Sequence, residues 1–222
     1  MSRSTRPQIG AGVDDGLLDA NADAIARRIG GLAGAPGGIH CMMIDMEDHT
    51  VVDRTIALHD RLAAAGFPVA LTLQAYLRRT EADILRLIER PARVRLVKGA
   101  FVAGSDIAFT THAEIKANYR RLVDLMLSGT ARASGFYPII ATHDDRLHAY
   151  ARDVARRNGW PAGTYEFEML MGVRGDVAEG LSRGGERVRL YVPFGKDWWP
   201  YAIRRIGENP RNALLLARSL LS

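Results

Sequence analysis

The sequence of 222 residues contains one cysteine, Cys41, which excludes an internal disulfide. It has no apolar run of the about 18 residues that a membrane-spanning helix needs, and its polar start MSRSTRPQIG has no apolar core of a secretion signal. Lysine and arginine are spread along the chain without a basic run, so we expect no nucleic-acid partner. These absences favour a reducing, cytoplasmic setting.

The composition is that of an ordinary globular domain. Hydrophobic residues make up 47% and charged residues 25% of the chain, and the net charge is +5. These values suffice for one sizeable core. Because no linker, repeat or low-complexity segment interrupts the chain, the sequence predicts a single domain over residues 1–222.

Apolar segments rich in β-branched residues recur along the chain and are continuous rather than alternating, as is typical of parallel strands buried on both faces. Helical patterns separate them, and two of these patterns begin with a threonine and an aspartate at capping-box spacing, Thr50 with Asp53 and Thr80 with Asp83. The alternation predicts βα units around a parallel sheet. The expected strands are 39–46, 67–76, 93–100, 136–143, 164–170 and 186–195.

Both a doubly wound sheet and a (β/α) barrel fit this alternation. A doubly wound nucleotide-binding domain normally has GxGxxG after its first strand, whereas GAGVDDG at 10–16 has another spacing and no strand before it. This favours the barrel. The loop 101–111 is a candidate lid or rim of its site face.

Polar residues end every expected strand. In a barrel, the carboxyl ends of the strands meet on one face, which holds the active site. Any one such residue can instead be a helix cap or a surface group. The strand-end residues are Asp45, Gln74, Lys98, Thr142, His143, Glu168 and Tyr191.

Arg95 lies inside an expected strand, where a guanidinium without a partner is costly. Asp45 is the obvious carboxylate to pair with it, either as a structural ion pair or as part of the site. The small residues Gly99 and Ala100 leave an open strand end where a planar ligand can approach, and Lys98 can neutralise an anion there. An ordinary turn explains the same three residues.

The segment FGKDWWPYAIRRIGE at 194–208 gathers aromatic rings before two adjacent arginines. Arg204 and Arg205 point about 100° apart on a helix, and Glu208 is spaced to hold either of them. Two guanidiniums held in this way suit a carboxylate ligand, and the rings can exclude water from it. Surface pairing and core packing remain alternatives.

The stretches RLVKGA, ATH, YEFEML and YVPFGKDWWPYAIRRIGE together resemble proline dehydrogenase, and IDMED and LQAYLRRTEADI match as well. The resemblance covers roughly residues 10–222 in the family's order. It implies a (βα)8 TIM-like barrel that binds FAD without a Rossmann domain. It also implies oxidation of L-proline to Δ1-pyrroline-5-carboxylate with a quinone as electron acceptor. A place at the inner face of the membrane is then an alternative to the free cytoplasm.

The resemblance also assigns roles to residues of this chain, and it implies no metal site. The catalytic residues are Asp45, Arg95 and Tyr191; the FAD-binding residues are Met46, Gln74, Arg95, Lys98, Gly99, Ala100, Thr142 and His143; and the proline-binding residues are Tyr201, Arg204, Arg205 and Glu208.

This chain departs from the family pattern at Phe101, Glu168 and Met171. These departures leave two alternatives beside proline oxidation. One is a family member without catalysis that serves as a binding or assembly subunit. The other is a flavoenzyme for another cyclic or N-alkyl amino acid.

The segment 39–46 resembles the family's third strand, so we expect an incomplete barrel of about six βα units that corresponds to strands 3–8, with the N-terminal part lacking. Thr5 then stands where the family's second strand ends in a lysine. Unpaired sheet edges would invite pairing with another chain as an oligomer. We expect weak or no activity from the chain as given.

Overall fold

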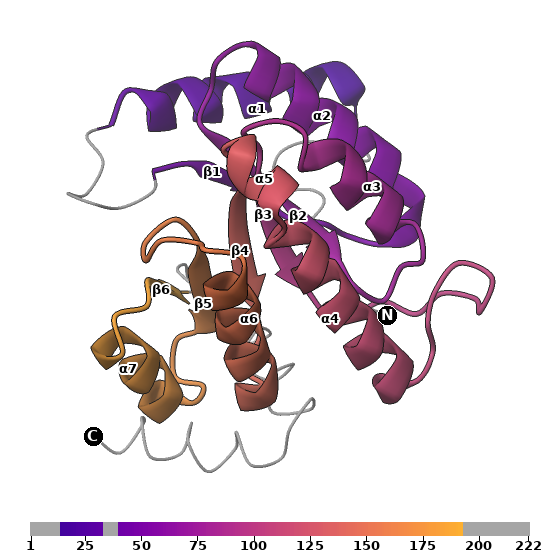
Figure 1. Cartoon of the computed structure of the whole chain (residues 1–222). Coiled ribbons are helices and arrows are strands. Elements are labelled where there is room, and N and C mark those ends of the chain that lie inside the picture. Colours follow the sequence, from indigo (N-terminus) through magenta and orange to yellow (C-terminus); the bar gives the residue numbers. More distant parts are fainter. Residues whose placement is uncertain (1–13, 33–39, 193–222) are drawn as a thin grey trace, which may run out of the picture. The chain divides into compact units, whose positions relative to one another are not determined.

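The computed structural model describes residues 14–32 and 40–192. The chain divides into two compact units, Met1–Tyr137 and Pro138–Ser222, and each is described by itself. Figure 1 shows the helices and strands that the two units contain.

Unit 1 alternates helices with three parallel strands. Ile44 of the first strand lies opposite Leu71 of the second, and Thr72 of the second lies opposite Arg95 of the third. The elements are α1 (Asp15–Gly30), β1 (Met42–Ile44), the 3-10 turn η2 (His49–Val51), α2 (Val52–Ala64), β2 (Val69–Gln74), α3 (Thr80–Leu87), β3 (Arg93–Val97), α4 (His112–Met126) and α5 (Gly129–Ala133).

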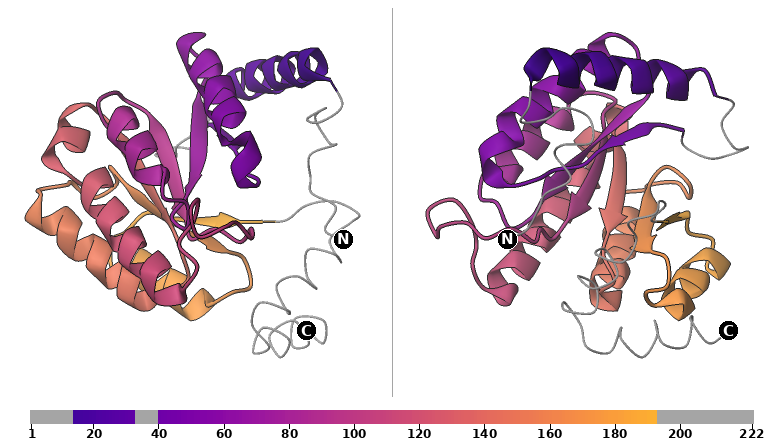
Figure 2. Two further views of the ribbon diagram at one scale, coloured as in Figure 1. Left: turned by 90° about the vertical axis from the view of Figure 1, so that its right-hand side faces the viewer. Right: turned by 180° about the vertical axis from the view of Figure 1, so that it is seen from behind.

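The strand β2 lies between β1 and β3, and all six of its residues are buried. A continuous apolar run fits this place, because a central strand is covered on both faces. Helix α1 lies beside α2, as both views of Figure 2 show, and packs Leu18, Ala22 and Ala26 against Ile44 and Leu62. This cluster fixes β1, and with it the loop that carries Asp45.

The helices of unit 1 begin in different ways. Asp14 caps α1 by accepting from the Leu17 amide at 2.7 Å. Thr111 and Glu114 form a complete capping box at the start of α4. The capping boxes expected at Thr50 and Thr80 were wrong, because neither α2 nor α3 has a side-chain cap.

Other side chains account for these two starts. Asp48 caps η2, the short turn before α2, by accepting from the Thr50 amide at 2.9 Å. Thr80 donates its hydroxyl to the carbonyl oxygen of Gln74 at 2.6 Å, and Asp83 binds Arg79 instead of the helix amides. The chain therefore enters α3 tied back to the end of β2.

Unit 2 also has parallel strands joined by helices. Ala141 lies opposite Glu168, and Glu168 lies opposite Arg189. On the other face of β5, the Phe167 ring contacts His148 edge-on, with ring centroids 5.2 Å apart. The elements are β4 (Tyr137–Ala141), α6 (Asp145–Arg157), β5 (Glu166–Leu170), α7 (Gly175–Arg183) and β6 (Val188–Tyr191).

The described strands match the six that the sequence predicts, and each is shorter than expected, as β1 shows with Met42–Ile44 in place of 39–46. The segment 194–208 lies outside the described residues. Within the described part of the chain, no helix is both long and apolar enough to span a membrane.

Candidate functional site

A polar network joins the three strands of unit 1. Arg95 of β3 donates to the carboxylate of Asp45, which directly follows β1. Its Nε donates to Thr72 Oγ1 at 3.0 Å, and the Thr72 hydroxyl lies 3.4 Å from Asp45 Oδ1. The predicted partner of Arg95 is therefore the one that it has, and the two charges meet near the carboxyl end of β1.

The register explains why these groups meet. Thr72 and Arg95 are directly opposite in adjacent parallel strands, so their side chains leave the same face of the sheet. Sequence reasoning missed Thr72, because a threonine in a buried strand is expected for its β-branched shape alone. Its position two residues before Gln74, on the same face as that strand-end residue, is the signal that could have found it.

Gln74 ends β2 and is buried. Its Nε2 lies 3.5 Å from the carbonyl oxygen of Met46. Its Oε1 is buried and has no hydrogen-bond partner among the described residues. A buried amide oxygen normally accepts a hydrogen bond, so Gln74 has acceptor capacity that the described part of the chain leaves unused.

Lys98, Gly99 and Ala100 directly follow β3. Gly99 has φ of +95°, in the region that favours glycine. The space that this glycine leaves open is filled by the ring of Tyr76, because a Cβ on Gly99 would lie 2.2 Å from Tyr76 Cδ1. On that side, the ring that approaches the backbone belongs to the protein; contact of the three residues with FAD stays a prediction.

The loop 101–111 is bonded to the segment that follows β2. Arg78 donates its Nε to the carbonyl oxygen of Ser105 at 3.0 Å, and its guanidinium lies 4.4 Å from the centroid of the Phe109 ring. The Phe109 amide donates to the carbonyl oxygen of Tyr76 at 2.8 Å. These contacts tie the loop to the segment after β2, and its role as a lid or rim stays a prediction.

In unit 2, Thr142 and His143 directly follow β4. Thr142 is buried, and its Oγ1 accepts from the Asp144 amide at 3.2 Å. Its carbonyl oxygen accepts from Nε2 of His148 at 2.8 Å. Burial lowers the pKa of His148, and the hydrogen bond from its ring holds the strand end in place. Sequence reasoning missed His148.

Glu168 and Tyr191 are the remaining described strand-end residues. Glu168 is buried on β5, whereas Tyr191 ends β6 and is exposed. On the same face as Glu168, the fully buried Glu166 accepts from Arg189 Nε at 2.6 Å and from its Nη2 at 3.2 Å. A two-bonded arginine of this kind offsets the cost of burying the Glu166 carboxylate.

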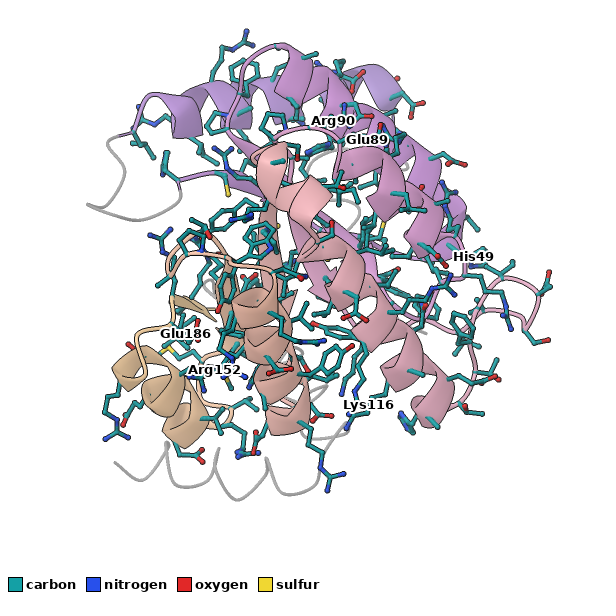
Figure 3. All side chains as sticks on the ribbon, in the orientation of Figure 1. His49, Glu89, Arg90, Lys116, Arg152 and Glu186 are labelled. Atoms are coloured by element: carbon teal, nitrogen blue, oxygen red, sulfur yellow. The ribbon has the colours of Figure 1, made fainter. Side chains whose placement is uncertain are left out.

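A second ion pair of unit 2 joins α6 to the segment just before β6. Figure 3 labels Arg152 and Glu186, and the Arg152 Nε donates to Glu186 Oε1 at 2.8 Å. Burial and a hydrogen bond to Glu186 raise the pKa of Tyr165, so its hydroxyl stays protonated. This group belongs to the packing of α6 and β5 and contains no predicted site residue.

The proline-binding residues predicted from the sequence, Tyr201, Arg204, Arg205 and Glu208, lie outside the described residues. Of the predicted site residues that the structure describes, it brings together Asp45, Arg95, Met46 and Gln74 in unit 1. The roles of all these residues stay predictions.

Comparison with solved structures shows the fold. Proline utilization A from Bdellovibrio bacteriovorus, inactivated by N-propargylglycine, superposes with a TM-score of 0.71 at 20% identity, over 94% of this chain and 29% of that one. A bifunctional proline utilization A protein gives a TM-score of 0.70 at 24% identity, over 87% of this chain and 21% of that one. The fold is an incomplete α/β barrel, as the sequence predicts.

Comparison with curated sequences shows the family. A family model described as proline dehydrogenase matches residues 34–218. The chain is 37% identical to proline dehydrogenase from Deinococcus radiodurans, over 96% of this chain and 67% of that protein. It is 34% identical to proline dehydrogenase 1 from Bacillus subtilis, over 80% of this chain and 57% of that protein. The chain thus spans between about half and two thirds of these relatives, and it belongs to the proline dehydrogenase family.

Proposed function

We propose that this chain carries the site for FAD-dependent oxidation of L-proline to Δ1-pyrroline-5-carboxylate, with a quinone as the final electron acceptor. Membership of the family supports proline as the substrate. The single observation that carries the proposal is the network of Asp45, Thr72 and Arg95 beside Gln74 in unit 1. It places a buried cation and an unused acceptor at the strand ends where barrel enzymes bind substrates.

The residues present fit a flavin. Its ring system carries both an N–H donor and carbonyl acceptors. Gln74 offers a buried amide oxygen with no donor among the described residues, and Arg95 and Lys98 offer positive charge to carbonyl or phosphate oxygens. In this proposal Met46, Gly99, Ala100, Thr142 and His143 complete the FAD site. When bound, FAD supplies the two-electron acceptor of the reaction.

The protein's own groups orient the substrate. In the proposal, Arg204 and Arg205 bind the proline carboxylate, with Tyr201 and Glu208 beside them, and Tyr191 contacts the ring. Oxidation would remove a hydride, for which FAD is the acceptor, from the ring CH2 carbon next to nitrogen and release a proton from nitrogen to water, which leaves a C=N bond. The charges of Asp45 and Arg95 are already in position before the substrate binds, so these protein groups need to move little during the reaction.

The proposed function is tested on the native protein, in the longest form that contains these residues. We expect the protein purified with excess FAD to keep a flavin absorption spectrum after gel filtration, and L-proline to bleach it without oxygen. A quinone analogue should then restore the oxidised spectrum.

The alternatives give different results. A folded protein that takes up no FAD would contradict the proposal and favour a binding or assembly subunit. Bleaching by another cyclic amino acid but not by L-proline would indicate the other flavoenzyme, and Phe101 and Glu168 are the positions to exchange first.

For localisation we propose the cytoplasm. Cell fractionation tests this, and the protein should be found in the supernatant and not in the membrane pellet.

A further inference from the structure

Tyr76 lies two residues after the end of β2 and is 4% exposed. Its amide donates to the carbonyl oxygen of Lys98 at 3.0 Å, as the Ala75 amide does to that of Val97 at 2.8 Å. Its own carbonyl oxygen accepts from the Phe109 amide. The backbone of Tyr76 is therefore hydrogen-bonded through its amide to Lys98, after β3, and through its carbonyl oxygen to Phe109 in the loop 101–111.

The ring of Tyr76 lies against the backbone of Gly99. A Cβ on Gly99 would lie 2.2 Å from Cδ1, 2.9 Å from Cε1 and 3.0 Å from Cγ of Tyr76. No real side chain tolerates such contacts, and the φ of +95° separately favours glycine. Gly99 is thus constrained twice, once by its own backbone conformation and once by the neighbouring ring.

We propose that Tyr76 is a positioning residue for cofactor binding: its ring holds the backbone of residues 98–100 in the conformation that binds FAD. The inference rests on the proposed function. A shift of Gly99 toward β2 would drive its backbone into the ring, and a shift away would break the hydrogen bond from Tyr76 to Lys98. Both movements are opposed, so the strand end keeps one conformation.

The ring carbons, and not the hydroxyl, are the atoms of Tyr76 that lie against Gly99. The Tyr76 hydroxyl oxygen is buried and has no hydrogen-bond partner among the described residues. Burial and the nearby charge of Asp48 raise its pKa, so the hydroxyl stays protonated and adds no charge to the site. Phenylalanine should therefore replace Tyr76 without loss, whereas alanine should not.

Hydrogen exchange of the cofactor-free protein tests the effect on the backbone. In Tyr76→Ala we expect the amides of residues 76 and 109, which donate to the carbonyl oxygens of residues 98 and 76, to exchange about tenfold faster or more, because the cavity lets Gly99 move. Tyr76→Phe should exchange like the wild type. Leu62→Ala, at a buried position in the cluster of α1, α2 and β1, is the control for lost stability and should leave these two amides unchanged when compared at equal free energy of unfolding.

Titration with FAD tests the effect on the site. We expect the Kd of Tyr76→Ala to rise about tenfold, with a shifted visible flavin band, and that of Tyr76→Phe to stay as in the wild type. Equal exchange in Tyr76→Ala and the wild type would overturn the inference, and so would faster exchange with an unchanged Kd, or an equal loss in Tyr76→Phe. If the wild type itself binds no FAD, the proposed function fails and with it the cofactor role of Tyr76, whereas the exchange rates still report on its packing.

Discussion

The guanidinium of Arg95 donates to the carboxylate of Asp45, and the two side chains are unequally buried: that of Arg95 is 10% exposed and that of Asp45 is 58% exposed. A buried cation depends on its partner more than an exposed anion does, because only the buried group has lost its water. The fold creates this asymmetry, since Arg95 lies inside β3 and Asp45 directly follows β1.

The two members of this pair should therefore respond differently to substitution. Asp45→Ala removes a carboxylate that the buried guanidinium binds, and we expect the free energy of unfolding to fall by about 3 kcal/mol. Arg95→Met leaves an exposed carboxylate that water can solvate, and we expect a loss of about 1 kcal/mol. Urea denaturation measures both.

Asp15→Ala is the control, because Asp15 pairs with Arg54 at a place where both side chains are exposed. We expect a change of at most about 0.5 kcal/mol there. A loss in Arg95→Met as large as that in Asp45→Ala would contradict the argument from unequal burial.

The capping box of α4 predicts a second difference. Thr111 accepts from the Glu114 amide at 3.2 Å, and the Glu114 side chain accepts from the Thr111 amide at 3.1 Å. Thr111→Ala should lower the free energy of unfolding by about 1 kcal/mol. Asp53→Ala is the matched control, because among the described residues Asp53 makes an exposed ion pair with Arg79 and caps no helix. Equal losses in the two variants would contradict this assignment of the caps.

These helix starts show what spacing alone can predict. Threonine followed by an acidic residue three positions later occurs at Thr50, Thr80, Thr111 and Thr142, and only Thr111 forms the box. The reason is where the helix begins. Helix α3 starts at Thr80 itself, with Arg79 at the cap position, so the Thr80 hydroxyl lies one residue too far along the chain to cap it and donates to the carbonyl oxygen of Gln74. The strands were easier to predict, because a continuous β-branched run has few other places in a βα fold.

The contacts of the site could be predicted where a buried charge without a partner would destabilise the fold. A guanidinium inside a strand requires a carboxylate, and Asp45 was the obvious one. Tyr76 could not be found in the same way, because its contact depends on the φ of Gly99 and on the path of the loop before α4. Neither leaves a pattern in the sequence.

Two buried histidines predict a loss of stability in mild acid. Burial lowers the pKa of His59 and of His148 from the ordinary value of 6.5. The unfolded chain therefore binds protons more readily than the folded protein does. Stability is fully present above pH 6.5 and falls as the pH drops from there toward the lower pKa of the folded state, by up to about 1.4 kcal/mol per pH unit for each histidine.

The two rings have different charged neighbours, so each histidine is substituted separately. His59 faces Asp60, Arg86 and Arg90, whereas His148 faces Asp144, Asp145 and Arg174. Urea midpoints measured between pH 7.5 and pH 5 should shift less in His148→Gln and in His59→Gln than in the wild type. A slope that neither substitution reduces would show that other groups cause the dependence.

Thr72 gives the last prediction, because it lies between the two charges of the site. Its hydroxyl accepts from Arg95 Nε at 3.0 Å and lies 3.4 Å from Asp45 Oδ1. Thr72→Val keeps the shape of the side chain and removes the acceptor that Arg95 Nε uses, so we expect a loss of about 1–2 kcal/mol in the free energy of unfolding. Thr72→Ser keeps the hydroxyl and should recover most of it.

The same substitution separates positioning from mere stability. If Thr72 aligns Arg95 with Asp45, the loss from Thr72→Val should be smaller in an Asp45→Asn background, because the two changes then act on one network. In the protein kept saturated with FAD, Thr72→Val should slow bleaching by L-proline at saturating substrate. Additive losses in the double variant, together with unchanged bleaching, would show that Thr72 only fills space in β2 and does not align Arg95.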